Sequence, residues 1–365
     1  MTESAYIHIP FCKSKCKYCS FVSTVQTENI EDYVTALVRE IRHYYEQNPL
    51  KTIYFGGGTP SLLNINQVTK ILQNFNFSDN KEITFEINPD DTTKEYLEGL
   101  KALGVNRLSF GSQTFNDEIL KSIGRRHNSE NILKSVETAQ NAGFENISID
   151  LIYGLPNQTI ELLKNDLGII KTLGIQHVST YGLKIEPPSY FSSHLPKNLP
   201  DDDMQADMYL GVNDFLESIG YKRYEISNFA KEGYESKHNL NYWNNSEYYG
   251  FGAAAHGYKD GIRYSNTTYI EKYISNPLKH ENEHIVSKKE KLEEEIFLGF
   301  RREKGVNVKE INKKFDINFD EKYQNILKKF SLEYIIPTEA GYKLTLNGVL
   351  LSNNILAEFI DLKNL

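Results

Sequence analysis

Hydrophobic residues recur with two different periods along the first half of the chain. Short runs of β-branched and aromatic residues alternate with longer segments in which apolar residues return every three or four positions, as Tyr33, Leu37 and Ile41 do. The short runs predict strands at residues 6–9, 52–55, 82–87, 107–110, 147–152 and 177–181. The longer segments predict helices at residues 31–45, 66–74, 93–103, 131–142 and 160–173. This alternation predicts βαβ units and a parallel sheet.

Two α/β architectures fit this order of elements. Right-handed crossovers between six strands give either an open, three-quarter barrel or a doubly wound sheet, and the pattern alone leaves both open. A change of pattern after residue 183 ends the repeat. Residues 184–203 hold four prolines and three successive aspartates, which predicts a surface crossing, and a helix is expected at about 203–219.

The remainder of the chain divides into two further parts. An aromatic-rich stretch runs to about residue 273, and from about residue 287 the sequence is charged and helical, with a short β segment near 342–346. We therefore predict an α/β domain at 1–183, a barrel-completing and linker region at 184–280, and a small, mainly helical C-terminal domain at 281–365.

Composition narrows the class of protein. With 39% hydrophobic residues and no apolar run long enough to span a bilayer, the sequence predicts a soluble globular protein. The first residues, MTESAYIHIPF, contain neither a basic nor an apolar signal region, which predicts no secretory signal. A net charge of −8 argues against a nucleic-acid-binding surface. An odd number of clustered cysteines is typical of a reducing compartment, so a cytoplasmic location is expected.

The three cysteines of the chain, Cys12, Cys16 and Cys19, form one C-x3-C-x2-C motif. Three thiolates on one loop can hold three irons of a cubane cluster and leave the fourth iron open, whereas a complete cluster normally takes four cysteines. The interleaved lysines make the loop polar and are expected to favour thiolates. A zinc site with His8 or a distant histidine is the alternative, although the paired cysteine motif typical of zinc sites is missing.

Polar residues also follow the other predicted strands, where ligands of a parallel barrel are bound. The segment GGGTPS at 56–61 follows the second strand, and its glycines allow a ligand to approach the backbone closely. Glu86 ends the third strand, Gln113 and then Arg125 follow the fourth, and Asp150 ends the fifth. Each alone is compatible with a turn or a surface position. Together they predict one site at the carboxyl ends of the strands.

These motifs resemble those of the radical S-adenosylmethionine (SAM) superfamily and, within it, the oxygen-independent coproporphyrinogen III oxidase family. The resemblance covers about residues 5–260 by motif, and the tail is similar to that family's C-terminal domain. It implies a partial (β/α)6 radical SAM barrel, with a 4Fe–4S cluster held by Cys12, Cys16 and Cys19. It implies a first SAM site at Tyr6, Gly57 and Glu86. It implies a second SAM site at Tyr18, Gly58, Thr59, Gln113, Arg125 and Asp150, with further contacts at Gly182 and His256.

Two departures from the decarboxylase pattern favour a sister branch, the HemW-type heme chaperones. Phe21 stands where the decarboxylase has a fourth cysteine, and only eleven residues precede Cys12 where the decarboxylase has an N-terminal arm. The segment from His238 to Trp243, which holds the chain's single tryptophan, resembles the HNxxYW motif of that branch. A neutral imidazole can ligate heme iron and aromatic rings can stack on a porphyrin. His238 is therefore the first candidate for a heme ligand and His256 the second; the structural alternative is a buried His–Asn turn.

The leading hypothesis is a SAM-binding iron–sulfur protein that binds heme and delivers it to target proteins. The main alternative is oxidative decarboxylation of coproporphyrinogen III to protoporphyrinogen IX, which Phe21 argues against. A radical SAM enzyme with an unrelated substrate and a binding module with a vestigial cluster are the other options. The expected partners are heme, a heme-accepting protein and a protein that reduces the cluster. A membrane-associated acceptor and a monomeric or dimeric state both stay open.

Overall fold

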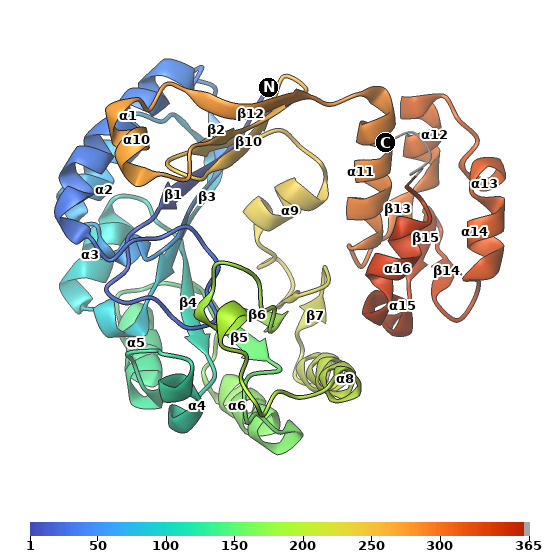
Figure 1. Cartoon of the computed structure of the whole chain (residues 1–365), viewed down its shortest axis with the longest axis horizontal. Coiled ribbons are helices and arrows are strands. Elements are labelled where there is room, and N and C mark those ends of the chain that lie inside the picture. Colours follow the sequence, from blue (N-terminus) through green and yellow to red (C-terminus); the bar gives the residue numbers. More distant parts are fainter. Residues whose placement is uncertain (361–365) are drawn as a thin grey trace.

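Six parallel strands follow one another around the main sheet in chain order (Figure 1). The structure is a computed structural model that describes residues 1–360. The strands are β1 (Ser4–Ile9), β2 (Leu50–Gly57), β3 (Phe77–Ile87), β4 (Arg107–Gln113), β5 (Asn146–Tyr153) and β6 (His177–Gly182). A doubly wound sheet reverses its strand order at a switch point. The order β6-β5-β4-β3-β2-β1 has no such reversal, so the open barrel is confirmed.

Helices on the outside connect these strands (Figure 1). They are α1 (Ile30–Tyr44), α2 (Ile65–Leu72), α3 (Lys94–Ala102), α4 (Asp117–Ser122), α5 (Ser129–Asn141) and α6 (Ile160–Thr172). Short 3-10 turns add η1 (Thr27–Asn29), η2 (Pro60–Leu62) and η3 (Pro89–Asp91). Side chains of Asn64, Asn128 and Thr159 cap α2, α5 and α6 by accepting a hydrogen bond from the third helical residue. The sequence prediction missed α4, which is too short to show a helical period.

The two faces of the barrel strands differ in polarity. Residues such as Ile83, Phe85 and Ile87 of β3 point outward and pack in the core beneath the helices. The alternate residues point inward, and they hydrogen-bond across neighbouring strands: Tyr54 to Glu86, Ser109 to Asp150, and Ser148 to His177. Because successive side chains of a strand face opposite sides, the outer face supplies the apolar core and the interior is lined with polar groups.

The segment after β6 extends the barrel sheet at both edges. Strands β7 (Lys222–Arg223) and β8 (Asn228–Ala230) continue it antiparallel beyond β6, and β9 (Tyr249–Phe251) pairs parallel with β1. Strands β10 (His256–Lys259), β11 (Ile262–Asn266) and β12 (His280–Ile285) form a separate antiparallel sheet. The helices here are α7 (Tyr190–Ser193), α8 (Asp202–Ser218), α9 (Lys237–Trp243) and α10 (Ile270–Ser275).

The predicted surface crossing at 184–203 is correct for most of its length and wrong at three buried positions, Ser189, Phe191 and Pro200. Phe191 of α7 is buried, and it packs with Ile119 and Ile123 of the α4 region and with Leu155. Its backbone N–H donates to the carbonyl oxygen of Lys17 at 2.9 Å. The segment therefore covers the cysteine loop rather than only crossing the surface.

The C-terminal part is built around its own apolar cluster, which includes Ile296, Phe300, Phe319 and Ile355. Its helices are α11 (Lys288–Phe300), α12 (Val308–Phe315), α13 (Phe319–Lys322), α14 (Gln324–Lys329), α15 (Leu346–Leu350) and α16 (Ser352–Ala357). The single predicted β segment is β15 (Gly341–Leu344), which pairs with β13 (Val306–Asn307) and β14 (Ile335–Pro337). The mainly helical character is confirmed, whereas the domain boundaries stay a prediction.

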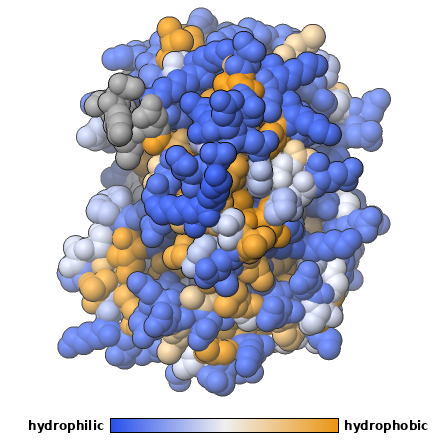
Figure 2. Space-filling model, turned by 90° about the vertical axis from the view of Figure 1, so that its right-hand side faces the viewer, coloured by the Kyte–Doolittle hydropathy of each residue, from blue (hydrophilic) through white to orange (hydrophobic). Residues whose placement is uncertain are grey.

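The surface of this C-terminal part is mainly hydrophilic, with apolar residues in small scattered groups (Figure 2). Its exposed large apolar side chains include Leu332, Leu350 and Leu351. Isolated exposed apolar residues are normal for a folded protein. Among residues 1–360, no helix is both long enough and apolar enough to cross a bilayer.

Candidate functional site

The cysteine loop between β1 and α1 is fastened to the barrel along its length. The backbone N–H of Cys12 donates to the carbonyl oxygen of Thr24 at 2.8 Å, which closes the loop on itself. The N–H of Lys17 donates to the carbonyl oxygen of Ile123 at 2.9 Å, and Lys17 Nζ donates to that of Ser122 at 2.9 Å. The loop thus presents its three thiols from a fixed backbone at the carboxyl ends of the strands.

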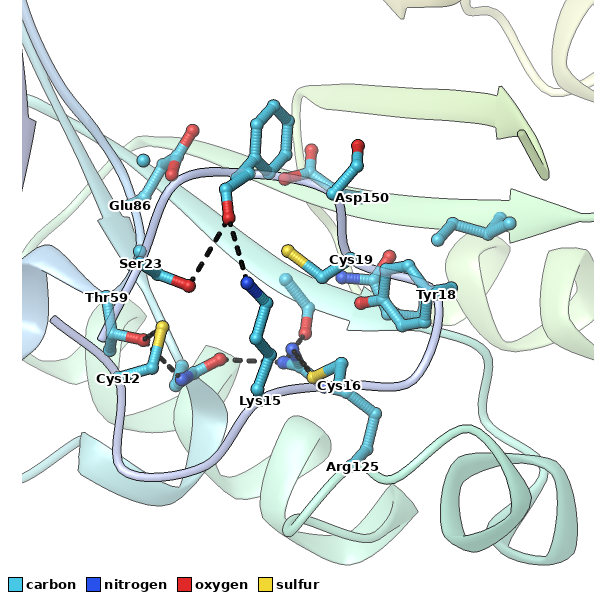
Figure 3. Close-up of a pocket in the computed structure, with 18 of the residues that line it drawn as sticks. Cys12, Lys15, Cys16, Tyr18, Cys19, Ser23, Thr59, Glu86, Arg125 and Asp150 are labelled. Atoms are coloured by element: carbon cyan, nitrogen blue, oxygen red, sulfur yellow. Dashed lines mark hydrogen bonds between the residues drawn. The ribbon is translucent and has the colours of Figure 1, made fainter. Parts of the chain in front are cut away.

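All three thiols line one cavity of about 410 Å³ at the mouth of the barrel (Figure 3). Most of the predicted SAM-site residues line the same cavity: Tyr18, Gly57, Gly58, Thr59, Glu86, Gln113, Arg125 and Asp150. The sequence prediction of a common site at the strand ends therefore agrees with the geometry. Phe21, Asn88, Ser109 and Tyr181 line it as well.

Two of the sulfurs accept hydrogen bonds from side chains. Thr59 Oγ1 donates to Cys12 Sγ and Arg125 Nη1 donates to Cys16 Sγ, each at 3.5 Å (Figure 3). The interleaved lysines bond to oxygens instead, as Lys15 Nζ does to the carbonyl oxygen of Phe21 at 3.4 Å. The positive group that contacts a sulfur is therefore an arginine far away in the sequence.

The interleaved lysines favour thiolates only weakly in this structure. Burial raises the pKa of Cys12 and of Cys19, and the charge of Lys15 lowers that of Cys19 only as the weakest of several effects. The free energy lost when a thiolate is removed from water exceeds the electrostatic stabilisation that a distant, solvated ammonium group provides. A bound iron supplies the charge that holds a ligating thiol deprotonated.

The arrangement fits a cluster better than a single metal ion. Within residues 1–360 no three His, Cys, Asp or Glu side chains converge on the position of one ion. A cubane places its cysteine ligands on separate irons, so they need not converge. His8, the zinc ligand considered from the sequence, has both ring nitrogens in hydrogen bonds, to Tyr6 Oη and to the carbonyl oxygen of Val22, each at 3.0 Å.

The glycines of the GGGTPS segment are required by close packing. Gly57 has a φ of 110°, and a Cβ there would lie 2.5 Å from the ring of His8. A Cβ on Gly58 would lie 2.7 Å from the carbonyl oxygen of Phe11. A Cβ on Gly56 would lie 3.1 Å from both Glu86 Oε1 and the ring of Tyr6. Tyr6 does not line the cavity, but its ring and the Glu86 carboxylate both lie next to Gly56.

Two partly buried carboxyl groups face the cavity from neighbouring parts of the barrel. Burial raises the pKa of Glu86 to about 7; the hydroxyl of Tyr54, which donates to Oε1 at 2.8 Å, lowers it, and the charge of Asp150 raises it. Burial also raises the pKa of Asp150, which accepts a hydrogen bond from Ser109 at 3.1 Å. Gln113 lies nearby with a φ of 71°, a left-handed conformation that is strained for a residue with a side chain.

The segment with the predicted heme ligand lies at the other end of the barrel interior. In Figure 1, α9 lies between the barrel and the C-terminal part. His238 is buried, with Nδ1 2.8 Å from Thr52 Oγ1 and Nε2 2.8 Å from Tyr242 Oη. Burial, and less so the charge of Arg107, lowers the pKa of His238 to about 3, so its imidazole is neutral.

Helix α9 is anchored to the barrel by a buried carboxylate that the sequence analysis missed. Glu82 of β3 accepts hydrogen bonds from the backbone N–H groups of Lys237 and His238, each at 3.0 Å. It accepts a third from Ser236 Oγ at 3.4 Å. A carboxylate at the free N–H groups of a helix N-terminus stabilises that helix. The available signal was the alternation of polar and apolar residues in 82–87.

His256, the second heme candidate, is in a different environment from His238. It begins β10 and its side chain is exposed, whereas His238 is 1% exposed. Neither residue lines the cysteine cavity. The structure therefore brings the cysteines and most of the predicted SAM residues together, whereas Tyr6, Gly182 and both histidines lie outside this cavity. His238 still contacts its wall, because its ring centroid lies 5.3 Å from that of Tyr54.

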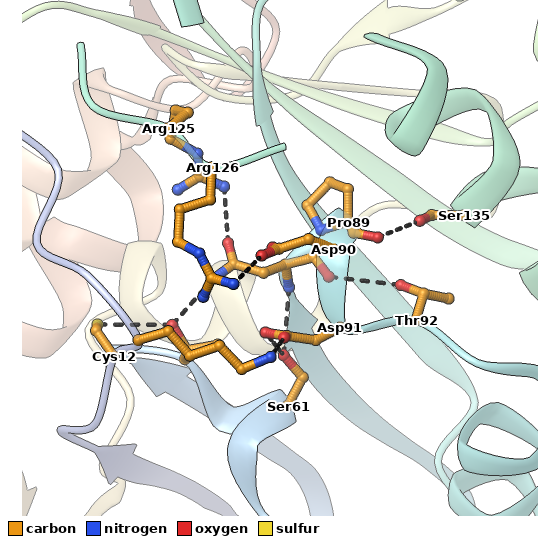
Figure 4. Close-up of polar contacts among 12 residues, drawn as sticks. Cys12, Ser61, Pro89, Asp90, Asp91, Thr92, Arg125, Arg126 and Ser135 are labelled. Atoms are coloured by element: carbon orange, nitrogen blue, oxygen red, sulfur yellow. Dashed lines mark hydrogen bonds and ion pairs between the residues drawn. The ribbon is translucent and has the colours of Figure 1, made fainter. Parts of the chain in front are cut away.

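A second polar network holds the cysteine loop to the loop after β3 (Figure 4). Lys13 forms an ion pair with Asp91, whose side chain is 4% exposed. Ser61 Oγ donates to Asp91 Oδ2 at 3.4 Å, and Arg126 pairs with Asp90 at 3.3 Å. These aspartates follow Glu86 in the sequence, but a two-residue acidic turn gave no signal of its role.

Comparison with known proteins agrees with this geometry. Residues 6–168 match the radical SAM superfamily and residues 286–351 match the HemN C-terminal domain. The heme chaperone HemW of Bacillus subtilis is 41% identical over 98% of this chain and 99% of its own length. That of Lactococcus lactis is 40% identical over 98% of this chain and 97% of its own. The chain belongs to the HemW family.

The fold of this HemW-family chain is also that of a solved structure. Coproporphyrinogen III oxidase (HemN) from Escherichia coli, a radical SAM enzyme, matches with a TM-score of 0.86 over 98% of this chain and 90% of that one. The sequence identity is 24%, so the match is one of fold. Membership in the radical SAM superfamily implies a 4Fe–4S cluster and SAM, and the three thiols in one cavity fit that pair of ligands.

Proposed function

We propose that this protein holds a 4Fe–4S cluster and SAM at the mouth of its barrel, binds heme, and delivers the heme to an acceptor protein. The observation that carries the proposal is the similarity to heme chaperones along the full chain, joined to three thiols that line one cavity. A protein that reduces the cluster is the further partner expected for a radical SAM site.

We propose a role for each group of residues in the cavity wall. Cys12, Cys16 and Cys19 hold three irons, and the cluster when bound offers its fourth iron to SAM. Glu86 accepts hydrogen bonds from the ribose hydroxyls of SAM, since its carboxylate faces the cavity beside Gly56 of the glycine segment. The remaining proposed SAM contacts are Tyr6, Tyr18, Gly57, Gly58, Thr59, Gln113, Arg125 and Asp150.

The buried carboxyl of Glu86 predicts a pH-dependent affinity for SAM. Its pKa of about 7 means that the acceptor form is fully present above pH 8 and is lost as the pH falls through 7. We expect the dissociation constant of SAM to rise about tenfold between pH 8 and pH 6, as follows when only the ionised form binds. Anaerobic titration of the cluster-loaded protein measures it, and Glu86→Gln should remove this dependence. A flat profile in the native protein contradicts the role of Glu86.

His238 is the proposed axial ligand of heme. A metal-ligating histidine commonly donates its second ring N–H to a neighbour, which fixes the tautomer. In His238, the hydrogen bond between Nδ1 and Thr52 would fix the tautomer in this way. Nε2 becomes available to the iron when the side chain of Tyr242 rotates away from it. The aromatic residues of α9, Tyr242 and Trp243, then lie beside the porphyrin.

Heme binding is therefore expected to depend on His238 and not on His256. His238→Ala should shift the Soret band and raise the dissociation constant of heme at least tenfold. A tenfold rise corresponds to the loss of about 1.4 kcal/mol of binding free energy. His256→Ala is the matched control and should retain both properties. Heme titration with a melting curve for each variant distinguishes the outcomes. A native Soret band in His238→Ala, together with a lowered melting temperature, would assign His238 a structural role.

Delivery is tested with the heme-loaded protein. It is mixed with an apo-hemoprotein from the same organism, and transfer is followed by the change in the Soret band. Transfer that is faster than from free heme in the same buffer supports the proposal. A protein that binds no heme under anaerobic conditions with its cluster intact would refute it.

Decarboxylation of coproporphyrinogen III is the second candidate function, favoured by the fold shared with HemN. We expect no conversion to protoporphyrinogen IX, because Phe21 replaces a fourth cysteine and its exposed ring overhangs the cavity. The measurement is anaerobic turnover with reconstituted cluster, reductant and excess SAM. Product above the enzyme-free control would place the decarboxylase ahead of the chaperone.

A further inference from the structure

Asn88 lies directly after β3, between the cysteine loop and the α4–α5 connection, and its side chain bridges two residues of the cavity. Its Nδ2 donates to Thr59 Oγ1 at 3.1 Å, and its Oδ1 accepts from Arg125 Nη2 at 2.7 Å. Neither partner is near Asn88 in the sequence. Both belong to loops at the carboxyl ends of other strands, after β2 and after β4.

Each partner of Asn88 in turn donates to a different cysteine. Thr59 Oγ1 donates to Cys12 Sγ and Arg125 Nη1 donates to Cys16 Sγ (Figure 3). One unbroken chain of hydrogen bonds therefore joins two of the three sulfurs through a single amide group. Hydrogen bonds to the sulfurs help to set the potential of an iron–sulfur cluster, and such outer partners orient the ligands themselves.

The direction of this chain is fixed by the chemistry of its members. Arg125 has donors only, so the amide oxygen of Asn88 must face it and the amide NH2 must face Thr59. Thr59 accepts that bond, which leaves its hydroxyl hydrogen to donate to Cys12. We propose that Asn88 is a positioning residue of the cluster site, which aims the donors of Thr59 and Arg125 at two cluster sulfurs. The inference rests on the cluster of the proposed function.

The amide group is the critical feature. An aspartate at position 88 has the same shape but accepts on both oxygens, so the hydroxyl of Thr59 would donate to it and leave Cys12. The backbone anchor would survive, because the N–H of residue 88 donates to Ser61 Oγ at 3.3 Å. The Lys13–Asp91 ion pair does not involve the side chain of residue 88 and is also kept. Asn88→Asp should therefore fold and test the donor direction.

The test compares Asn88→Asp, Thr59→Val and the double variant in anaerobically reconstituted full-length protein. Both single variants should lower the midpoint potential of the cluster and speed its loss to a chelator about tenfold, as for one hydrogen bond to a charged group. Since Asn88 acts on Cys12 through Thr59, adding Thr59→Val to Asn88→Asp should change chelator loss little further. The control for the exchange of an amide for a carboxylate is Asn128→Asp, because an aspartate can also cap α5. Its midpoint potential and its rate of cluster loss should match those of the native protein.

Several results overturn the proposal. One is a native midpoint potential of the cluster in either single variant. Another is a rate of cluster loss in the double variant that equals the sum of both single effects. A third is an Asn88→Asp protein that takes up no cluster while Thr59→Val behaves as native. The proposed function fails separately, if the native protein itself holds no cluster. EPR-monitored redox titration gives the potential, and a melting curve for each variant excludes general unfolding.

Discussion

Replacing Cys12, Cys16 or Cys19 by serine is expected to abolish the cluster completely. The three thiols line one cavity, and the sequence contains no other cysteine that could replace a lost ligand. A serine hydroxyl is of similar size but stays protonated near neutral pH, so it does not take the place of a thiolate on iron. Iron and acid-labile sulfide should fall from about four of each per chain, as in a 4Fe–4S cluster, to background.

The matched control is Ser14→Ala, a change in the same loop and the same cavity that removes no sulfur. It should retain native iron, sulfide and visible absorbance. The cysteine variants should keep their melting temperature as apoproteins, because the loop is fastened by backbone bonds of Cys12 and Lys17. A single cysteine variant with full native absorbance would contradict the cluster assignment, and zinc in place of iron in the native protein would do so as well.

The order of strands and helices was predictable because local patterns determine it. The strand predicted at 147–152 is β5 (Asn146–Tyr153), and the helix predicted at 160–173 is α6 (Ile160–Thr172). The choice between a barrel and a doubly wound sheet was not predictable from this order, since both contain the same units. The decisive evidence is spatial: β1 to β6 lie side by side in chain order, without the reversal of a doubly wound sheet.

The polarity of the barrel interior was within reach of the sequence. Glu82, Thr84 and Glu86 alternate with three apolar residues, and the sequence analysis used only the last of these polar positions. Full use of a period of two predicts a polar inner face. It would have identified Glu82, which anchors α9, before the structure was known.

The contacts of Arg125 could not have been derived from spacing. The motif placed it at the strand ends, but its donors reach Cys16 and Asn88, which come from two other loops. Loop conformation depends on many distant contacts, such as the bond between Lys17 and Ile123. For the same reason the ranking of His238 over His256 came from motif resemblance, whereas their difference in burial appears only in three dimensions.

Loss of the Glu86 carboxylate should cause the second largest effect, a strong fall in SAM affinity. Glu86→Ala removes a partly buried acceptor, whose proposed hydrogen bonds from the ribose hydroxyls would be worth roughly 1.5–3 kcal/mol. That free energy corresponds to an increase of about 10- to 150-fold in the dissociation constant. Gly57→Val is a poorer probe of the same site, because its side chain would collide with His8 and distort the fold.

Glu86→Ala also leaves the hydroxyl of Tyr54 without its acceptor, so Tyr54→Phe is the matched control. This change breaks the same internal hydrogen bond but keeps the carboxylate, and it frees one lone pair for the ligand. Because the Tyr54 hydroxyl lowers the pKa of Glu86, the variants are compared well above pH 8, where Glu86 is ionised. Tyr54→Phe should then bind SAM within about threefold of the native protein, since it keeps the carboxylate. Equal losses in the two variants would mean that the internal bond, and not a ribose contact, explains the effect.

Unchanged SAM affinity in Glu86→Ala, measured by anaerobic titration with the cluster intact, would remove Glu86 from the SAM site. A carboxylate that contacts the ribose cannot be deleted without a loss of affinity.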